Sequence, residues 1–150
     1  MIVSGKKHGE FLIGKTRDCG DAHFDPDKRR VRFENGLHPI RDSFWYAISL
    51  FEDGSEEVFE RAEAIVWAVL GQQEKHANHP RKGAFKLWAE DSESVDFNWA
   101  DFNAWNLPEM IFCHGQHPFA GIGARCFSEI HHYGSALLRS CYFRRRIIGK

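Results

Sequence analysis

The chain has 150 residues, of which 43% are hydrophobic and 27% are charged, and its formal net charge is −1. This length and composition are typical of one globular domain, so we treat residues 1–150 as a single domain. A charge so close to zero provides no field that would attract nucleic acid, and no apolar run approaches the roughly 18 residues of a membrane span. We therefore expect no membrane partner and do not favour a nucleic-acid partner, although the arginines at 139 and 144–146 keep a nucleic-acid binder as a third hypothesis.

Four cysteines occur in a chain whose N-terminus has too short an apolar stretch for a secretory signal. Cysteines in that context are typical of free thiols in a reducing compartment. The sequence therefore predicts a cytoplasmic protein without disulfides.

Two segments near the N-terminus have the apolar pattern of β-strands, residues 10–17 and residues 29–36. In the second segment Val31 and Phe33 alternate with charged neighbours, which predicts a half-exposed strand. Residues 18–28 between them are rich in acids and turn formers, and we expect a turn there.

The next unit is predicted as strand, helix and strand. Residues 43–51, SFWYAISLF, form an aromatic and β-branched run that is typical of a buried strand. Ser55 can cap a helix that extends over 55–75, whose apolar face repeats at helical spacing. That face consists of Val58, Ala62, Ile65, Val66 and Val69. Residues 84–90 alternate again and predict another strand.

The second half of the chain has weaker patterns. Residues 94–99 and 109–114 are typical of short strands, with a short helix near Asp101 between them. Residues 124–143 fit helical spacing but also fit a pair of strands about Gly134, and we favour the helix. Together the elements predict an α+β fold: an antiparallel or mixed sheet of about five to six strands, with the 55–75 helix and a C-terminal helix packed on one face.

Aromatic side chains are the most unusual feature of the composition, with 13 Phe, 5 Trp and 3 Tyr. Such side chains dominate cores, interfaces and ligand pockets. We interpret the chain as a non-enzymatic module that binds a small molecule or a protein through an aromatic-lined pocket or dimer interface. The expected ligand-binding residues are Trp45, Tyr46, Trp88, Trp99 and Trp105, with Arg125 in a glycine-rich loop that could hold an anion.

The alternative function is a hydrolase or transferase centred on residues 113–132. In this alternative a thiolate would act as the nucleophile and an imidazole as its base. The candidate catalytic residues are Cys113, His117, His131 and His132. Because this stretch lacks the tight ligand pairs of structural zinc sites, we expect no metal and no cofactor.

The acidic residues between 18 and 28 allow two interpretations. Asp18, Asp21, His23, Asp25 and Asp27 could supply ligands to a cation. Asp also forms ordinary turns by bonding its own backbone, and we favour a solvated turn.

Charge segregation bears on the oligomeric state. The helix at 56–70 is acidic on its outer face, and the last residues of the chain carry several arginines. These opposite charges and the surplus of aromatic residues predict a homodimer.

Overall fold

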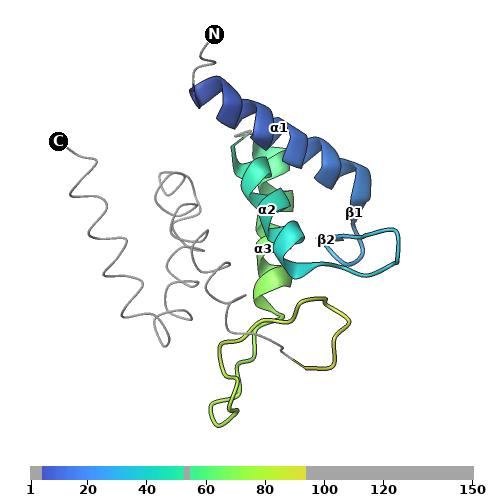
Figure 1. The fold of residues 1–150 in the computed structure, drawn as a ribbon, viewed down its shortest axis with the longest axis vertical. Helices are drawn as coiled ribbons and strands as arrows, with labels where there is room; N and C mark the ends of the chain where they lie inside the picture. The colour runs from blue at the N-terminus through green and yellow to red at the C-terminus, as the bar shows by residue number, and fades with distance from the viewer. Residues whose placement is uncertain (1–4, 53–54, 94–150) are drawn as a thin grey trace, which may run out of the picture. The chain divides into compact units, whose positions relative to one another are not determined.

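The structure is a computed structural model that describes residues 5–52 and 55–93 of the chain (Figure 1). In these residues the order is α1 (Gly5–His23), β1 (Phe24–Asp25), β2 (Arg30–Val31), α2 (Ile40–Phe51) and α3 (Glu56–Leu70). The described part is thus an α+β mix of three helices and one two-stranded antiparallel sheet. The prediction of a sheet of five to six strands is wrong.

Helix α1 occupies the segment for which a strand and a turn were predicted. Its less exposed positions include Gly9, Ile13, Thr16, Arg17 and Gly20, which recur at helical spacing. Because two of these positions are glycine and two are polar, a search for apolar periodicity does not detect this face.

Helix α2 replaces the strand predicted at 43–51. Its buried side chains include Ile40, Phe44, Ala47, Leu50 and Phe51, at the i, i+4, i+7, i+10 and i+11 positions of a helix. Buried serines fill gaps in the same apolar run, and their hydroxyls bond to carbonyls of the preceding turn. A continuous run of large residues therefore resembled a buried strand, although its deepest positions follow helical spacing.

Helix α3 confirms the central part of the predicted 55–75 helix, but it ends at Leu70. Ser55 and Gly71 occupy the two cap positions, as the sequence indicated. The Ser55 side chain makes no capping hydrogen bond, so the proposed role of its hydroxyl is wrong. The apolar face is buried at Ala62, Ile65, Val66 and Val69.

The core of the described unit lies mainly between α2 and α3, and α1 packs on α2 (Figure 1). At one end of the α2–α3 interface, the rings of Phe51 and Phe59 meet edge to face with centroids 5.4 Å apart. Burial of such apolar surface is the main driving force for the fold.

The short hairpin of β1 and β2 follows α1 directly. Phe24 pairs with Val31 and Asp25 with Arg30, and the Arg32 amide extends the pairing by donating to the His23 carbonyl at 2.9 Å. The predicted strand at 29–36 is thus reduced to two residues. A turn follows in which Gly36 has a φ of 81°, which only glycine adopts readily.

Residues 84–90 do not form the predicted strand. They make only isolated bridges, Pro39 with Trp88 and Gln73 with Phe85. Next to the first bridge, the Ala89 amide donates to the His38 carbonyl at 2.9 Å. This contact places Glu90 beside His38.

The elements predicted at 94–99, near Asp101, at 109–114 and at 124–143 lie outside the described residues. Within residues 5–52 and 55–93, no helix combines the length and the apolar character needed to span a membrane.

Candidate functional site

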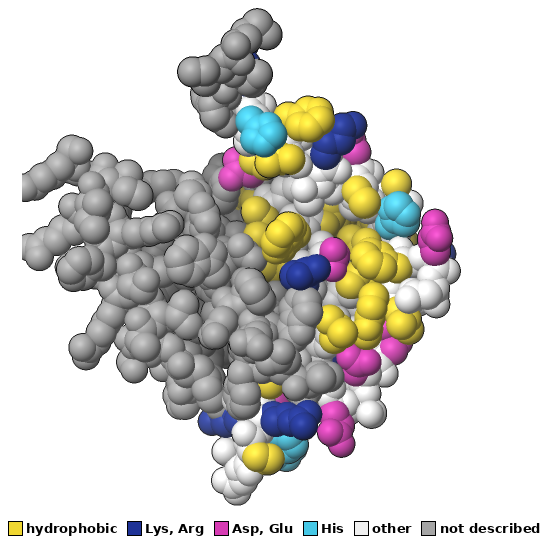
Figure 2. All heavy atoms as spheres, in the orientation of Figure 1, with side chains coloured by type: hydrophobic (Ala, Val, Ile, Leu, Met, Phe, Trp, Pro, Cys, Tyr) yellow, Lys and Arg dark blue, Asp and Glu magenta, His cyan; other side chains and the backbone are white. Residues whose placement is uncertain are grey.

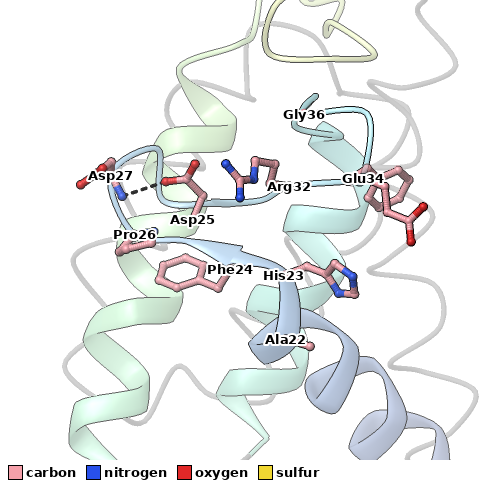
Figure 3. Close-up of a pocket in the computed structure, with 10 residues that line it drawn as sticks. Ala22, His23, Phe24, Asp25, Pro26, Asp27, Arg32, Glu34 and Gly36 are labelled. Atoms are coloured by element: carbon pink, nitrogen blue, oxygen red, sulfur yellow. Dashed lines mark hydrogen bonds between the residues drawn. The ribbon is translucent and has the colours of Figure 1, made fainter.

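An open pocket of about 550 Å³ lies beside the β1–β2 hairpin (Figure 3). We call it the hairpin pocket. The end of α1, both strands with their loop, and the turn after β2 form its walls, and its titratable residues are His23, Asp25, Asp27, Arg32 and Glu34. In Figure 3, Asp27 lies at one end, His23 and Glu34 lie at the other, and Asp25 and Arg32 lie between them. The volume is typical of small-molecule sites.

Asp25 is the most firmly held charge in the hairpin pocket. The sequence Asp25-Pro26-Asp27-Lys28 is typical of a tight turn, with Asp first and Pro second. Oδ1 of Asp25 accepts the backbone N–H groups of Asp27 at 3.0 Å and Lys28 at 3.1 Å. The Lys28 amide and the His38 ring lower the pKa of Asp25 below its usual 3.8. Asp25 is therefore a fixed carboxylate anion at neutral pH.

Behind Asp25 lies His38, which is only 5% exposed. Its Nε2 is 3.2 Å from Oδ2 of Asp25, and its Nδ1 is 2.5 Å from Oε1 of Glu90. The His38 backbone N–H also donates to Oε2 of Glu90 at 3.0 Å. We call this Asp25–His38–Glu90 arrangement the His38 bridge, and it fastens the hairpin to the start of α2 and to residue 90.

The pKa of Glu90 reflects two opposing influences. Burial raises it, but the hydrogen bonds from the backbone and ring of His38 outweigh burial and leave the pKa below its usual 4.5. Both carboxylates of the His38 bridge are therefore ionised in the folded protein near neutral pH.

Three other charged side chains of the hairpin pocket have no such partners. Arg32, Asp27 and Glu34 are exposed, and within the described residues their side chains make no hydrogen bond or ion pair. Arg30, on the same strand as the hairpin's buried Val31, differs because it donates to the Ala68 carbonyl near the end of α3 at 2.7 Å. Among the described residues, the pocket thus presents charged groups of both signs that have no partner there.

A second hollow of about 420 Å³ shares His23, Phe33 and Glu34 with the hairpin pocket and adds Cys19. Nδ1 of His23 is 4.0 Å from the Cys19 sulfur but only 2.9 Å from the Cys19 carbonyl oxygen. A carbonyl only accepts, so Nδ1 carries the proton and cannot act as the base for this thiol. The geometry gives no support to a Cys–His catalytic pair here.

Tyr46, one of the predicted ligand-binding residues, has a structural role in the described unit. Its side chain is buried, and its hydroxyl donates to Oδ1 of Asp21 at 2.5 Å. Arg61 of α3 also donates to that oxygen, at 3.1 Å. Burial and the Asp21 carboxylate raise the pKa of Tyr46 to about 12. This cluster joins α1, α2 and α3 and fixes the end of α1 that leads into the hairpin.

Of the predicted tryptophans, the structure describes Trp45 and Trp88, and neither is among the residues that line the hairpin pocket. Trp45 is 51% exposed on α2, where the Arg41 guanidinium lies 5.8 Å from its ring centroid. Trp88 is half-buried, and its ring meets Phe33 edge to face at 5.8 Å. The other predicted site residues, namely Trp99, Trp105, Cys113, His117, Arg125, His131 and His132, lie outside the described residues.

Only part of this site could be predicted from the sequence. Asp25 and Asp27 stood out as acidic turn residues, and Asp25 does bond its own turn as predicted. His38 and Glu90 were missed because 52 positions separate them and no local motif links them. In the described part of the chain, no group of three His, Cys, Asp or Glu side chains could hold a metal ion.

The sequence matches no protein-family model, no curated protein and no solved structure. Arguments about function therefore rest on the chemistry of the site.

Proposed function

We propose that the chain is a non-enzymatic binding module whose hairpin pocket takes a small zwitterion, of the size and charge of a basic amino acid. The observation that carries this proposal is the guanidinium of Arg32, which makes no hydrogen bond or ion pair within the described residues and lines the pocket together with three carboxylates. A guanidinium is well suited to hold a carboxylate, which it can bind through two parallel hydrogen bonds.

The charges of the pocket favour a ligand with more positive than negative groups. Among the side chains that line the pocket, the three carboxylates of Asp25, Asp27 and Glu34 outnumber the one guanidinium of Arg32. Asp25 is held by the turn and by His38, so it offers a preorganised acceptor for an ammonium group. Phe33, which is 39% exposed on the wall, offers apolar surface to an aliphatic stem. L-lysine has this combination of groups.

The direct test is calorimetric titration of L-lysine into the full chain and into two arginine variants. Arg32→Gln removes the proposed carboxylate partner, and hydrogen bonds to charged groups are worth about 1.5–3 kcal/mol, so affinity should fall by about tenfold or more. Arg29→Gln is the matched control, because Arg29 lies in the same hairpin loop but does not line the pocket. An equal loss in both variants, or the absence of binding to the wild-type chain, would refute the proposal.

Two analogues test the zwitterionic requirement separately. Cadaverine lacks the carboxylate of lysine, and 6-aminohexanoate lacks its α-amine. We expect both to bind more weakly than L-lysine, and we expect Arg32→Gln to leave cadaverine binding unchanged. Cadaverine that binds as well as lysine would replace the zwitterion with a simple cation as the ligand.

Homodimerisation and a cytoplasmic location are further proposals. Phe11, Leu12 and Trp45 are each more than half exposed, and Figure 2 shows apolar side chains interspersed with single charges on the described face. Apolar surface of this kind is compatible with an interface between copies. The exposed free thiol of Cys19 suits a reducing compartment.

A further inference from the structure

We propose that His38 is a charged, doubly protonated link between the hairpin and residue 90, and that loss of one ring proton releases the hairpin. This makes the His38 bridge a pH-sensitive device built into the fold. The inference goes beyond the proposed function, because it concerns the order of the hairpin and holds with or without a ligand.

The count of N–H groups supports the doubly protonated state. Each ring nitrogen of His38 faces a carboxylate oxygen, at 2.5 Å for Glu90 and 3.2 Å for Asp25. An ionised carboxylate only accepts, and a neutral imidazole has a single N–H to donate. Both carboxylates have lowered pKa values and are ionised near neutral pH. Only an imidazolium can therefore donate to both.

The charged side chains that contact the ring also suit an imidazolium. Within the described residues, the charged groups at the His38 ring are the carboxylates of Asp25 and Glu90. Arg30 also interacts electrostatically with Glu90. His38 is thus a buried cation between two anions, the arrangement in which a buried charge is tolerated.

The two hydrogen bonds of the His38 ring are unequal, and this difference determines which ring nitrogen loses its proton. Glu90 accepts both the ring Nδ1–H and the backbone N–H of His38, and its ring contact is the shorter. When the ring loses a proton, Nδ1 should therefore keep its hydrogen. The bare Nε2 then faces Oδ2 of Asp25, and two lone pairs oppose each other.

The hairpin loop should respond because Asp25 holds it. The other oxygen of Asp25 accepts the amides of Asp27 and Lys28, and β1 and β2 together contain only four residues. A ladder of this length has little stability of its own. Release of Oδ2 should therefore loosen the loop that forms one wall of the hairpin pocket.

Nuclear magnetic resonance of the full chain over a pH series can observe both ends of this link. Long-range ¹H–¹⁵N spectra should show both His38 ring nitrogens protonated at low pH, and a single transition in which Nε2 alone loses its proton. Across the same transition, amide protection at Asp27 and Lys28, corrected for base catalysis, should fall by about threefold or more, as expected for the loss of one net hydrogen bond. A His38 ring with only one protonated nitrogen wherever the protein is folded would overturn the proposal.

Two variants establish the cause. In His38→Gln the protection at Asp27 and Lys28 should no longer change across that pH range, whereas His79→Gln, at an exposed histidine near Glu74, should behave like wild type. Should His38→Gln fail to fold, Asp25→Asn serves instead, and its His38 ring should titrate without any change in residual loop protection. Protection that still follows the His38 transition in the variant that folds would overturn the proposal.

Discussion

The aromatic ring of Tyr46 lies directly against the backbone of Gly20, so a Cβ atom at residue 20 would come within 1.9 Å of the ring carbon Cδ2. Glycine at this position therefore lets α1 pack closely on α2. The hydroxyl of the same side chain donates a hydrogen bond to Asp21, which also lies on α1. The contact lies in the last turn of α1, just before the hairpin begins.

Two glycine substitutions in α1 should have opposite effects on stability. Gly20→Ala should destabilise by about 1–3 kcal/mol, because the added methyl overpacks the Tyr46 contact. Gly14→Ala meets nothing within 4 Å and should stabilise by about 0.5–1 kcal/mol through helix propensity. Urea unfolding of both variants checks this, and a Gly20→Ala protein as stable as Gly14→Ala would show that the close contact is wrong.

Ser43 is expected to matter more than Ser49, although both are buried on α2. The Ser43 hydroxyl accepts the Val31 amide at 3.0 Å and donates to the Pro39 carbonyl at 2.7 Å, whereas Ser49 only donates, to Tyr46. Ser43→Ala leaves a buried β2 amide without its acceptor and should cost about 1–3 kcal/mol. Ser49→Ala should cost less in the same unfolding experiment, and equal losses would contradict the role of Ser43 in anchoring β2.

Acid should destabilise the protein through the His38 bridge. The pKa values of Asp25 and Glu90 are lower in the folded state than their usual 3.8 and 4.5. The folded state thus binds fewer protons, so their contribution is complete above these usual values and is lost as the pH falls below about 4.5.

The matched variants are Asp25→Asn and Glu90→Gln, with Glu60→Gln at an exposed position of α3 as the control. Urea unfolding between pH 7 and pH 3 should show a shallower pH dependence in the two bridge variants than in wild type. The control should keep the wild-type slope. Bridge variants that keep that slope would assign acid unfolding to other carboxylates.

Light scattering over a range of concentrations should give twice the chain's 17.4 kDa if the proposed homodimer forms. Trp45→Ala should shift the equilibrium toward the monomer if the exposed tryptophan lies in the interface. Added salt should have little effect if apolar contacts dominate, and a large one if the C-terminal arginines do. A mass of 17.4 kDa at every concentration rules out the dimer.

The sequence predicted α3 well because its apolar positions repeat cleanly at helical spacing and Ser55 and Gly71 stand at its ends. The prediction was wrong at 43–51, where exposed Trp45, Ile48 and the buried residues form a run of mostly apolar side chains, broken only by Ser49 after its first position, that hides a helical period. The strand predicted at 10–17 was also wrong. The packed face of α1 includes Gly20, which allows the close contact because it has no side chain, and apolar periodicity does not detect such a position.

The site was less predictable than the helices. The hydrogen bonds of Asp25 to its own turn are local, so the sequence alone could predict them. The His38 bridge depends on how residues 84–90 return to the start of α2 through the Pro39–Trp88 pairing, which no periodicity specifies. The charges of the hairpin pocket were visible in the sequence, but the fold determines which of them find a partner among the described residues.

The measurement that tests the central claim most directly is a ¹H–¹⁵N titration of the full chain with L-lysine. If the hairpin pocket is the binding site, the largest shifts should fall on amides between residues 22 and 36, and Arg32→Gln should reduce them. Shifts that gather instead around Trp45 and Trp88, or the absence of shifts at residues 22–36, would contradict this account.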